Sequence, residues 1–181
     1  DEQSDIRNNN EDIYELRIVA EDRRDRDRFS RLTFIHEQTD QTTEFLSTDG
    51  SVITQDLPDV EDELTFFHNW QFDAGNGLKH RLDGNIRLLN RIGFFDNRVA
   101  QIDEQLTLAH TPTFSTFYRV GYLYDERESL LDQTLQLEAG FTKQIYASLQ
   151  IIGRGYYLDR TLDNGYDRTV GTEFSFDYQK I

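Results

Sequence analysis

Four histidines are the side chains of this sequence best suited to acid–base or metal chemistry: His36, His68, His80 and His110. An imidazole acts as a general base when a hydroxyl and a carboxylate are held beside it. No serine lies two residues from any of the four, and the chain has 0 Cys. Their spacing matches no zinc-ligand pattern. We therefore expect no catalytic residue, no metal and no cofactor.

Two charged stretches are further candidates for ligand binding. Asp49, Asp56, Asp59 and Glu61 could gather calcium, but their spacing lacks the pattern of an EF-hand loop. The run Glu21–Arg28 mixes acidic residues with arginines. Two interpretations of this run stay open: its arginines bind lipid phosphates, or it is a solvated loop whose charges pair with one another.

The elements that must position these groups are strands. From about Glu63 to Tyr178 apolar and polar residues alternate with a period of two, which predicts strands with one apolar and one polar face. Leu64, Phe66, His68, Trp70 and Phe72 face one way, whereas Glu63, Thr65, Asn69, Gln71 and Asp73 face the other. Each run is about twice the usual soluble strand of roughly 5–6 residues and close to the roughly 9–11 that cross a bilayer. We therefore predict an all-β fold, an up-and-down antiparallel transmembrane β-barrel.

Composition agrees with that fold class. No run of about 18 apolar residues exists, which excludes a helical anchor, and a mean hydropathy of −0.71 suits a barrel because only half of each strand contacts lipid. A net charge of −15 argues against nucleic acid as a partner. No signal peptide precedes Asp1, so we expect a processed chain or a piece of a longer one.

We expect a flexible polar tail at 1–12 and a barrel domain at 13–181, with ten strands. The third is the weakest, because Thr48-Asp49-Gly50 could equally be a turn. The expected strands are 13–20, 28–38, 43–53, 62–73, 77–92, 98–110, 113–125, 130–142, 145–159 and 168–179.

Short and long connections between these strands alternate along the chain. Tight links at 74–77, 111–112 and 143–144 alternate with longer ones at 93–97, 126–129 and 160–167. Extended toward the N-terminus, the rule makes 21–27 and 54–61 outer loops and 39–42 an inner turn. Outer-membrane barrels have short periplasmic turns and longer outer loops. An even strand count then places both termini on the periplasmic side.

The polar face carries charges of both signs. One such charge facing lipid near the middle of a bilayer costs about 2–4 kcal/mol, so in a membrane barrel this face must line the lumen. Large residues on the same face favour a packed or very narrow interior, and a slight excess of acids favours cations. The expected lumen-lining residues are Lys79, Arg81, Asp83, Arg87, Arg91, Asp103, Arg119, Asp125, Asp132, Glu138, Arg154, Glu173 and Asp177.

Aromatic residues gather near the predicted strand ends, where amphipathic rings favour the headgroup level of a membrane. We expect two aromatic girdles, formed by Trp70, Phe72, Phe114, Tyr122, Tyr124, Phe141, Tyr146, Tyr157, Phe176 and Tyr178. Glu104 breaks the apolar face, and we expect either a β-bulge there or a contact with another subunit.

The segments Thr134–Phe141, Ser148–Tyr157 and Val170–Tyr178 resemble hairpins of bacterial outer-membrane β-barrel proteins of the porin-like class. The final aromatic strand is similar to the C-terminal signal of that class, although this chain continues through Gln179-Lys180-Ile181. The resemblance implies location in the bacterial outer membrane and contact with outer-membrane lipid and lipopolysaccharide. Other subunits or a lumen-filling partner are further possible partners.

The function we expect is a porin-like narrow pore or a structural scaffold without catalysis. Two alternatives stay open. The first is an outer-membrane enzyme acting on lipid or peptide at the barrel rim, which would need a histidine and a carboxylate or serine to converge. The second is a soluble β-barrel or sandwich that binds an apolar ligand.

Overall fold

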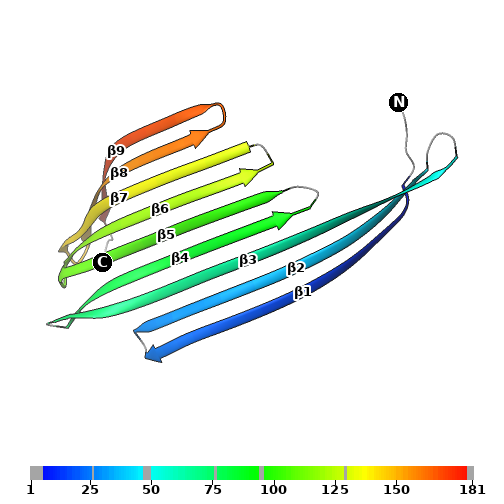
Figure 1. The fold of residues 1–181 in the computed structure, drawn as a ribbon. Coiled ribbons are helices and arrows are strands. Elements are labelled where there is room, and N and C mark those ends of the chain that lie inside the picture. Colours follow the sequence, from blue (N-terminus) through cyan, green and yellow to red (C-terminus); the bar gives the residue numbers. More distant parts are fainter. Residues whose placement is uncertain are drawn as a thin grey trace.

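The computed structural model describes residues 6–25, 27–46, 50–75, 77–93, 96–128 and 130–178. Within these ranges the chain is built from nine strands joined by hairpins (Figure 1). The strands are β1 (Ile6–Asp25), β2 (Arg28–Leu46), β3 (Val52–Gly75), β4 (Leu78–Ile92), β5 (Asn97–Thr111), β6 (Phe114–Arg127), β7 (Leu130–Tyr146), β8 (Leu149–Leu162) and β9 (Gly165–Tyr178).

The nine strands form one sheet in sequence order, and every neighbouring pair is antiparallel. This confirms the predicted all-β, up-and-down arrangement. β1 and β9 are the two edges of the sheet. No pairing between these edges closes the sheet among the described residues, so closure into a barrel stays a prediction.

The register sorts the side chains onto two faces, because directly paired residues share a face. One row joins Phe34, Leu64, Leu88, Ala100 and Tyr124 across β2 to β6, and we call this side of the sheet the apolar face. The row beside it joins Thr33, Thr65, Arg87 and Gln101 and belongs to the opposite side, which we call the polar face.

The sheet has no second layer packed on it to form a core. Leu89, at 8% exposed, is the one large apolar side chain in the described ranges that is buried. Large apolar residues remain exposed instead, including Ile18, Leu88, Val120 and Phe174 on the apolar face. A soluble sandwich would bury these side chains. The fold therefore leaves a continuous apolar surface for some other medium to cover.

The two ends of the sheet differ in their hairpins. At one end, which we call the turn end, two residues separate the strands in all four hairpins, β1–β2, β3–β4, β5–β6 and β7–β8. Each of the four has a register shift just before its turn, as at Asp73/Gly75. At the other end, the loop end, five residues separate β2 from β3 and four separate β4 from β5, whereas β6–β7 and β8–β9 have two.

The expected strand at 43–53 is wrong. β2 continues to Leu46 and β3 begins at Val52, so this segment is the hairpin between them. Gly50 has φ +85°, the left-handed conformation that glycine adopts without strain. The turn alternative at Thr48-Asp49-Gly50 is therefore supported at Gly50, although 48 and 49 lie outside the described residues. With nine strands, the start of β1 and the end of β9 lie at opposite ends of the sheet.

The three connections inferred near the N-terminus are also wrong. The expected inner turn 39–42 lies inside β2, and the expected outer loop 54–61 lies inside β3. Most of the expected outer loop 21–27 belongs to β1, and the connection that follows it is at the turn end. β1 also includes residues 6–12, which the sequence predicted as part of the polar tail.

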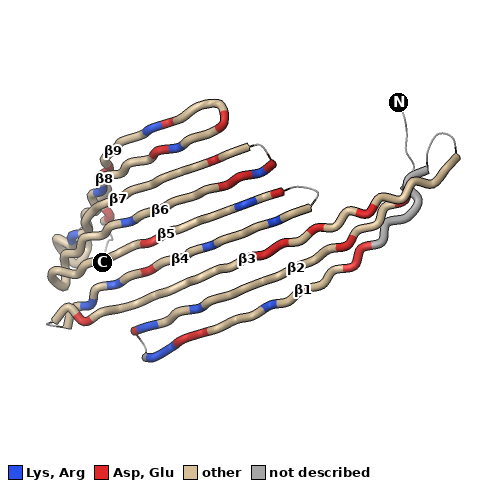
Figure 2. The backbone as a smooth tube through the Cα atoms, viewed as in Figure 1, with Lys and Arg blue, Asp and Glu red and all other residues tan. Residues whose placement is uncertain are grey.

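β1, β2 and β3 project well beyond the rest of the sheet at the loop end (Figure 1). β4 ends at Ile92, which pairs with Val60, so residues 52–59 of β3 pair with β2 alone. We call residues 52–59 of β3, together with the parts of β2 and β1 that pair beside them, the extension. Figure 2 shows acidic residues along it, whereas basic residues are concentrated in the body of the sheet.

Candidate functional site

Arginine–carboxylate pairs cross the polar face from strand to strand. Arg87 Nη2 lies 3.0 Å from Glu63 Oε2 between β4 and β3, and Arg119 Nη2 lies 2.6 Å from Asp103 Oδ2 between β6 and β5. Arg160 Nη2 lies 2.5 Å from Asp132 Oδ2 between β8 and β7. Antiparallel register places such residues on adjacent strands directly or diagonally opposite. The polar face is therefore a connected network of charges.

The most buried part of this network is centred on Arg154. Its Nη1 donates to Glu138 Oε1 at 3.1 Å, and its Nη2 donates to Glu173 Oε2 at 2.6 Å. The three residues thus link β7, β8 and β9. Glu138 is only 8% exposed, so its charge depends on the guanidinium beside it.

Every residue predicted to line a lumen lies on the polar face, as the register places it. All of them except Asp177 take part in the ion pairs that we describe. Besides the pairs above, these contacts are Lys79–Asp27, Arg81–Asp83, Arg91–Asp59 and Arg127–Asp125. A shared face and mutual pairing fit a polar lining.

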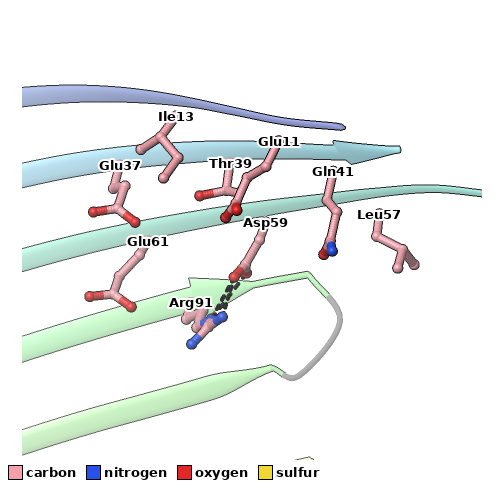
Figure 3. Close-up of a pocket in the computed structure, with 9 residues that line it drawn as sticks. All are labelled: Glu11, Ile13, Glu37, Thr39, Gln41, Leu57, Asp59, Glu61 and Arg91. Atoms are coloured by element: carbon pink, nitrogen blue, oxygen red, sulfur yellow. Dashed lines mark hydrogen bonds and ion pairs between the residues drawn. The ribbon is translucent and has the colours of Figure 1, made fainter. Parts of the chain in front are cut away.

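A hollow of the polar face lies where the extension leaves the body of the sheet (Figure 3). It has a volume of about 490 Å³. Arg91 forms an ion pair with Asp59 there, while Glu11, Glu37 and Glu61 supply three more carboxylates. Carboxylates outnumber cationic groups in this hollow, which we call the acidic hollow.

The ten residues predicted as aromatic girdles all lie on the apolar face. Tyr122, Tyr124 and Tyr157 lie toward the loop end. The others lie toward the turn end; they are Trp70, Phe72, Phe114, Phe141, Tyr146, Phe176 and Tyr178. The arrangement as two bands follows the prediction, and contact with a membrane interface stays a prediction.

Three histidines have ordinary polar partners. His36 Nδ1 lies 2.7 Å from Asp62 Oδ1, and His80 Nδ1 accepts a hydrogen bond from the backbone N–H of Ala109 at 3.2 Å. His110 Nε2 lies 2.9 Å from the hydroxyl of Thr116. In each case the partner lies on a neighbouring strand. The residues adjacent to the histidine in the sequence therefore do not predict the contact.

His68 has a partner that sequence reasoning missed. The register is continuous through Glu104, so the expected bulge there is wrong. Glu104 instead reaches across Gly84 to His68, and the Oε2–Nε2 distance is 3.2 Å. Because His68 pairs with Gly84 and Gly84 pairs with Glu104, only the strand register could have shown that these side chains meet.

No group of three or more histidine, aspartate or glutamate side chains within the described residues is arranged to hold a metal ion. The described part of the chain contains no helix with the length and apolarity needed to cross a bilayer.

Comparison with known proteins shows a distant structural similarity. No family model matches the chain, and no curated protein matches it. Among solved structures, the chain is similar to the β domain of the Bordetella autotransporter Brka, with a TM-score of 0.37. The alignment has 12% sequence identity and covers 96% of this chain and 75% of that chain. Similarity at this level assigns neither a family nor a function.

Proposed function

We propose that this chain forms the wall of a β-barrel in a bacterial outer membrane, with the apolar face toward lipid and the polar face toward a narrow lumen. The observation that carries the proposal is the pair of faces. In the body of the sheet one side is mostly apolar and much of it is exposed, and the other side bears arginine–carboxylate pairs. Hydrocarbon is the medium that such an exposed apolar surface matches.

Strand length supports the same arrangement. The strands contain 14 to 24 residues, whereas a tilted strand needs about 9–11 to cross a bilayer. The extension of β1 to β3 then lies outside the membrane, where charges on both faces contact water. The uniform bulged hairpins of the turn end support a periplasmic rim, because bulges are common at the rims of barrels.

Outer-membrane lipid and lipopolysaccharide are the partners that this orientation implies. Lipid chains would contact residues such as Leu88 and Ile86, and headgroups would lie at the two aromatic bands. Another subunit would complete the barrel. A lumen-filling partner would occupy its interior.

The lumen is narrow and favours cations. A barrel of about eight strands is filled by its own side chains, and open channels need about 16–18. Nine strands with a charged lining therefore leave little free cross-section. The acidic hollow lies at the entrance to this lining, and rings of carboxylates favour cation passage.

Conductance in planar bilayers tests this function. Purified protein should give small ohmic steps, and the reversal potential in a potassium chloride gradient should have the sign of a cation-preferring pore. Replacing Glu37 and Glu61 with glutamine should reduce that preference. The matched control replaces Asp12 of β1 and Asp40 of β2 with asparagine, an equal change of charge on the other face of the sheet.

Two results would contradict the pore. Folded protein that inserts but never conducts would leave the structural scaffold, in which the ion pairs fill the interior. Protein that stays dispersed without detergent, and whose gel mobility does not change on heating, would contradict the membrane barrel itself.

A further inference from the structure

Three chemically complementary side chains share one cross-strand row on the apolar face. Ser30 of β2 pairs with His68 of β3, His68 pairs with Gly84 of β4, and Gly84 pairs with Glu104 of β5. Paired residues project from the same side of a sheet. The row thus has the order serine, histidine and carboxylate, with the histidine between the other two and a glycine as the only spacer.

Gly84 is what allows the carboxylate to reach the imidazole. The carboxylate of Glu104 occupies the space that a β-carbon at position 84 would fill. Its Oε2 lies 3.2 Å from Nε2 of His68, which is close enough for an ion pair, although the geometry does not meet that of a hydrogen bond. His68 is 4% exposed and is enclosed by Phe66 and Trp70, whose ring centroids lie 5.5 and 4.5 Å from its own. The imidazole is therefore held in place on the side of Glu104.

The serine lies on the other side of the same imidazole. The indole N–H of Trp70 donates to Ser30 Oγ at 2.9 Å, so the oxygen acts as an acceptor and its own proton is free to be donated. Nδ1 of His68 has no hydrogen-bond partner among the described residues. Directly paired residues have β-carbons about 4.5–5.5 Å apart, so rotation about one side-chain bond brings the hydroxyl toward Nδ1.

A hollow of about 280 Å³ adjoins Ser30 on the apolar face. Arg28 lies over the ring of Phe72, 5.5 Å from its centroid, so cationic and aromatic groups stand side by side there. Guanidinium groups bind phosphate oxygens well, and aromatic walls suit acyl chains. The lining residues are Asp22, Arg24, Arg28, Ser30, Trp70 and Phe72.

We propose that Ser30 and His68, positioned by Glu104, hydrolyse the carboxylic ester bonds of anionic glycerophospholipids at the membrane interface. The substrate class rests on the proposed function, because only a lipid-facing wall brings such esters to this hollow. The arginines hold the phosphate, and the ester carbonyl lies beside Ser30, two residues farther along β2 from Arg28 on the same face.

The reaction needs only the lipid and water. Ser30 Oγ attacks the ester carbonyl carbon while His68 Nδ1 takes the hydroxyl proton. The ester C–O bond then breaks, and His68 returns the proton to the departing glycerol oxygen, which leaves as a lysophospholipid. Water, deprotonated by His68, attacks the acyl-serine and releases the fatty acid, which restores Ser30. Glu104 stabilises the imidazolium that forms in each step.

The test measures fatty acid release from phosphatidylglycerol in mixed detergent micelles by the purified full chain. Ser30→Ala and His68→Ala should each lower the rate by about 10³-fold or more. Ser175→Ala removes a hydroxyl on the polar face of β9 and should leave the rate unchanged. A fluorophosphonate should label Ser30 and fail to label the Ser30→Ala protein.

Two variants test the positioning role of Glu104. Glu104→Gln and Gly84→Ala should both lower kcat with little change in KM, by roughly 10²-fold or more. The alanine at position 84 acts by displacing the carboxylate from His68 while every functional group is retained. Glu104→Asp should recover part of the loss, which a purely structural role would not predict.

The outcomes separate this inference from the barrel. Wild-type protein that inserts into bilayers but hydrolyses no ester and is not labelled at Ser30 overturns the catalytic row and leaves the barrel intact. Unchanged hydrolysis by Ser30→Ala also overturns it. Failure to insert at all counts against the membrane proposal first.

Discussion

At the scale of single residues, the contribution of the polar face to the stability of the protein depends on how its charges are paired. Exposed ion pairs contribute little, about 0–1 kcal/mol, so most arginines of the face are replaceable one at a time. Glu138 differs, because its side chain is 6% exposed and contacts Arg154. A buried carboxylate that loses its cation retains the full cost of desolvation.

We predict that Arg154→Gln destabilises the protein by about 1–3 kcal/mol, since it removes the guanidinium that donates a hydrogen bond to the buried carboxylate of Glu138. The value lies below that of a fully buried pair because Arg154 is 41% exposed. Arg81→Gln, which breaks a polar-face pair whose arginine is 55% exposed, should cost less than about 1 kcal/mol. Urea unfolding in lipid vesicles measures both, and equal losses would contradict the network.

At the scale of the strand, residues adjacent in the sequence lie on opposite faces of the sheet and therefore have different surroundings. β4 is the clearest case, since Ile86 lies on the apolar face and Asn85 on the polar face near the middle of the strand. In water the two positions would tolerate a charge about equally, because both sides of the sheet lack a covering layer.

We predict that Ile86→Arg costs about 2–4 kcal/mol in a bilayer, since it places a charge in hydrocarbon. Asn85→Arg should cost under about 1 kcal/mol, because the neighbouring carboxylates of the polar face accept the charge. The free energy of unfolding from vesicles measures the difference. Similar values for the two variants would mean that the apolar face does not contact lipid.

At the scale of the whole molecule, the nine described strands do not form a closed antiparallel barrel by direct pairing of β1 with β9. β1 and β9 run in the same direction because an even number of antiparallel steps separates them. Direct pairing of the two edges would be parallel, whereas bacterial single-chain barrels pair all strands antiparallel and have an even number of them. A strand beyond the nine, or a second chain, would meet that rule.

The two ends of the sheet should lie on opposite sides of the membrane. The chain has 0 Cys, so single cysteines can be introduced without background. We predict that Thr54→Cys, in the extension, reacts with a membrane-impermeant maleimide on intact cells. Ala147→Cys, at the turn end, should react only after the cells are opened. The reverse pattern would invert the proposed orientation.

The sequence by itself determined the strands and their faces from β4 to β9. The period of two does not depend on how the strands pack, because successive side chains of a strand must point to opposite sides. For this reason the predicted lumen and girdle residues all fall on the expected faces. The N-terminal extension was missed because both of its faces carry many polar residues, so no alternating pattern marks it.

Only the tertiary structure decided which residues meet across strands. The pairing of β2 with β3 begins at Leu46 and Val52 and continues without a shift, and this register sets Ser30 beside His68. Gly84 then removes the side chain that would separate His68 from Glu104. Such contacts depend on hydrogen-bonded partners 16 to 38 positions apart in the chain, and local sequence carries no record of them.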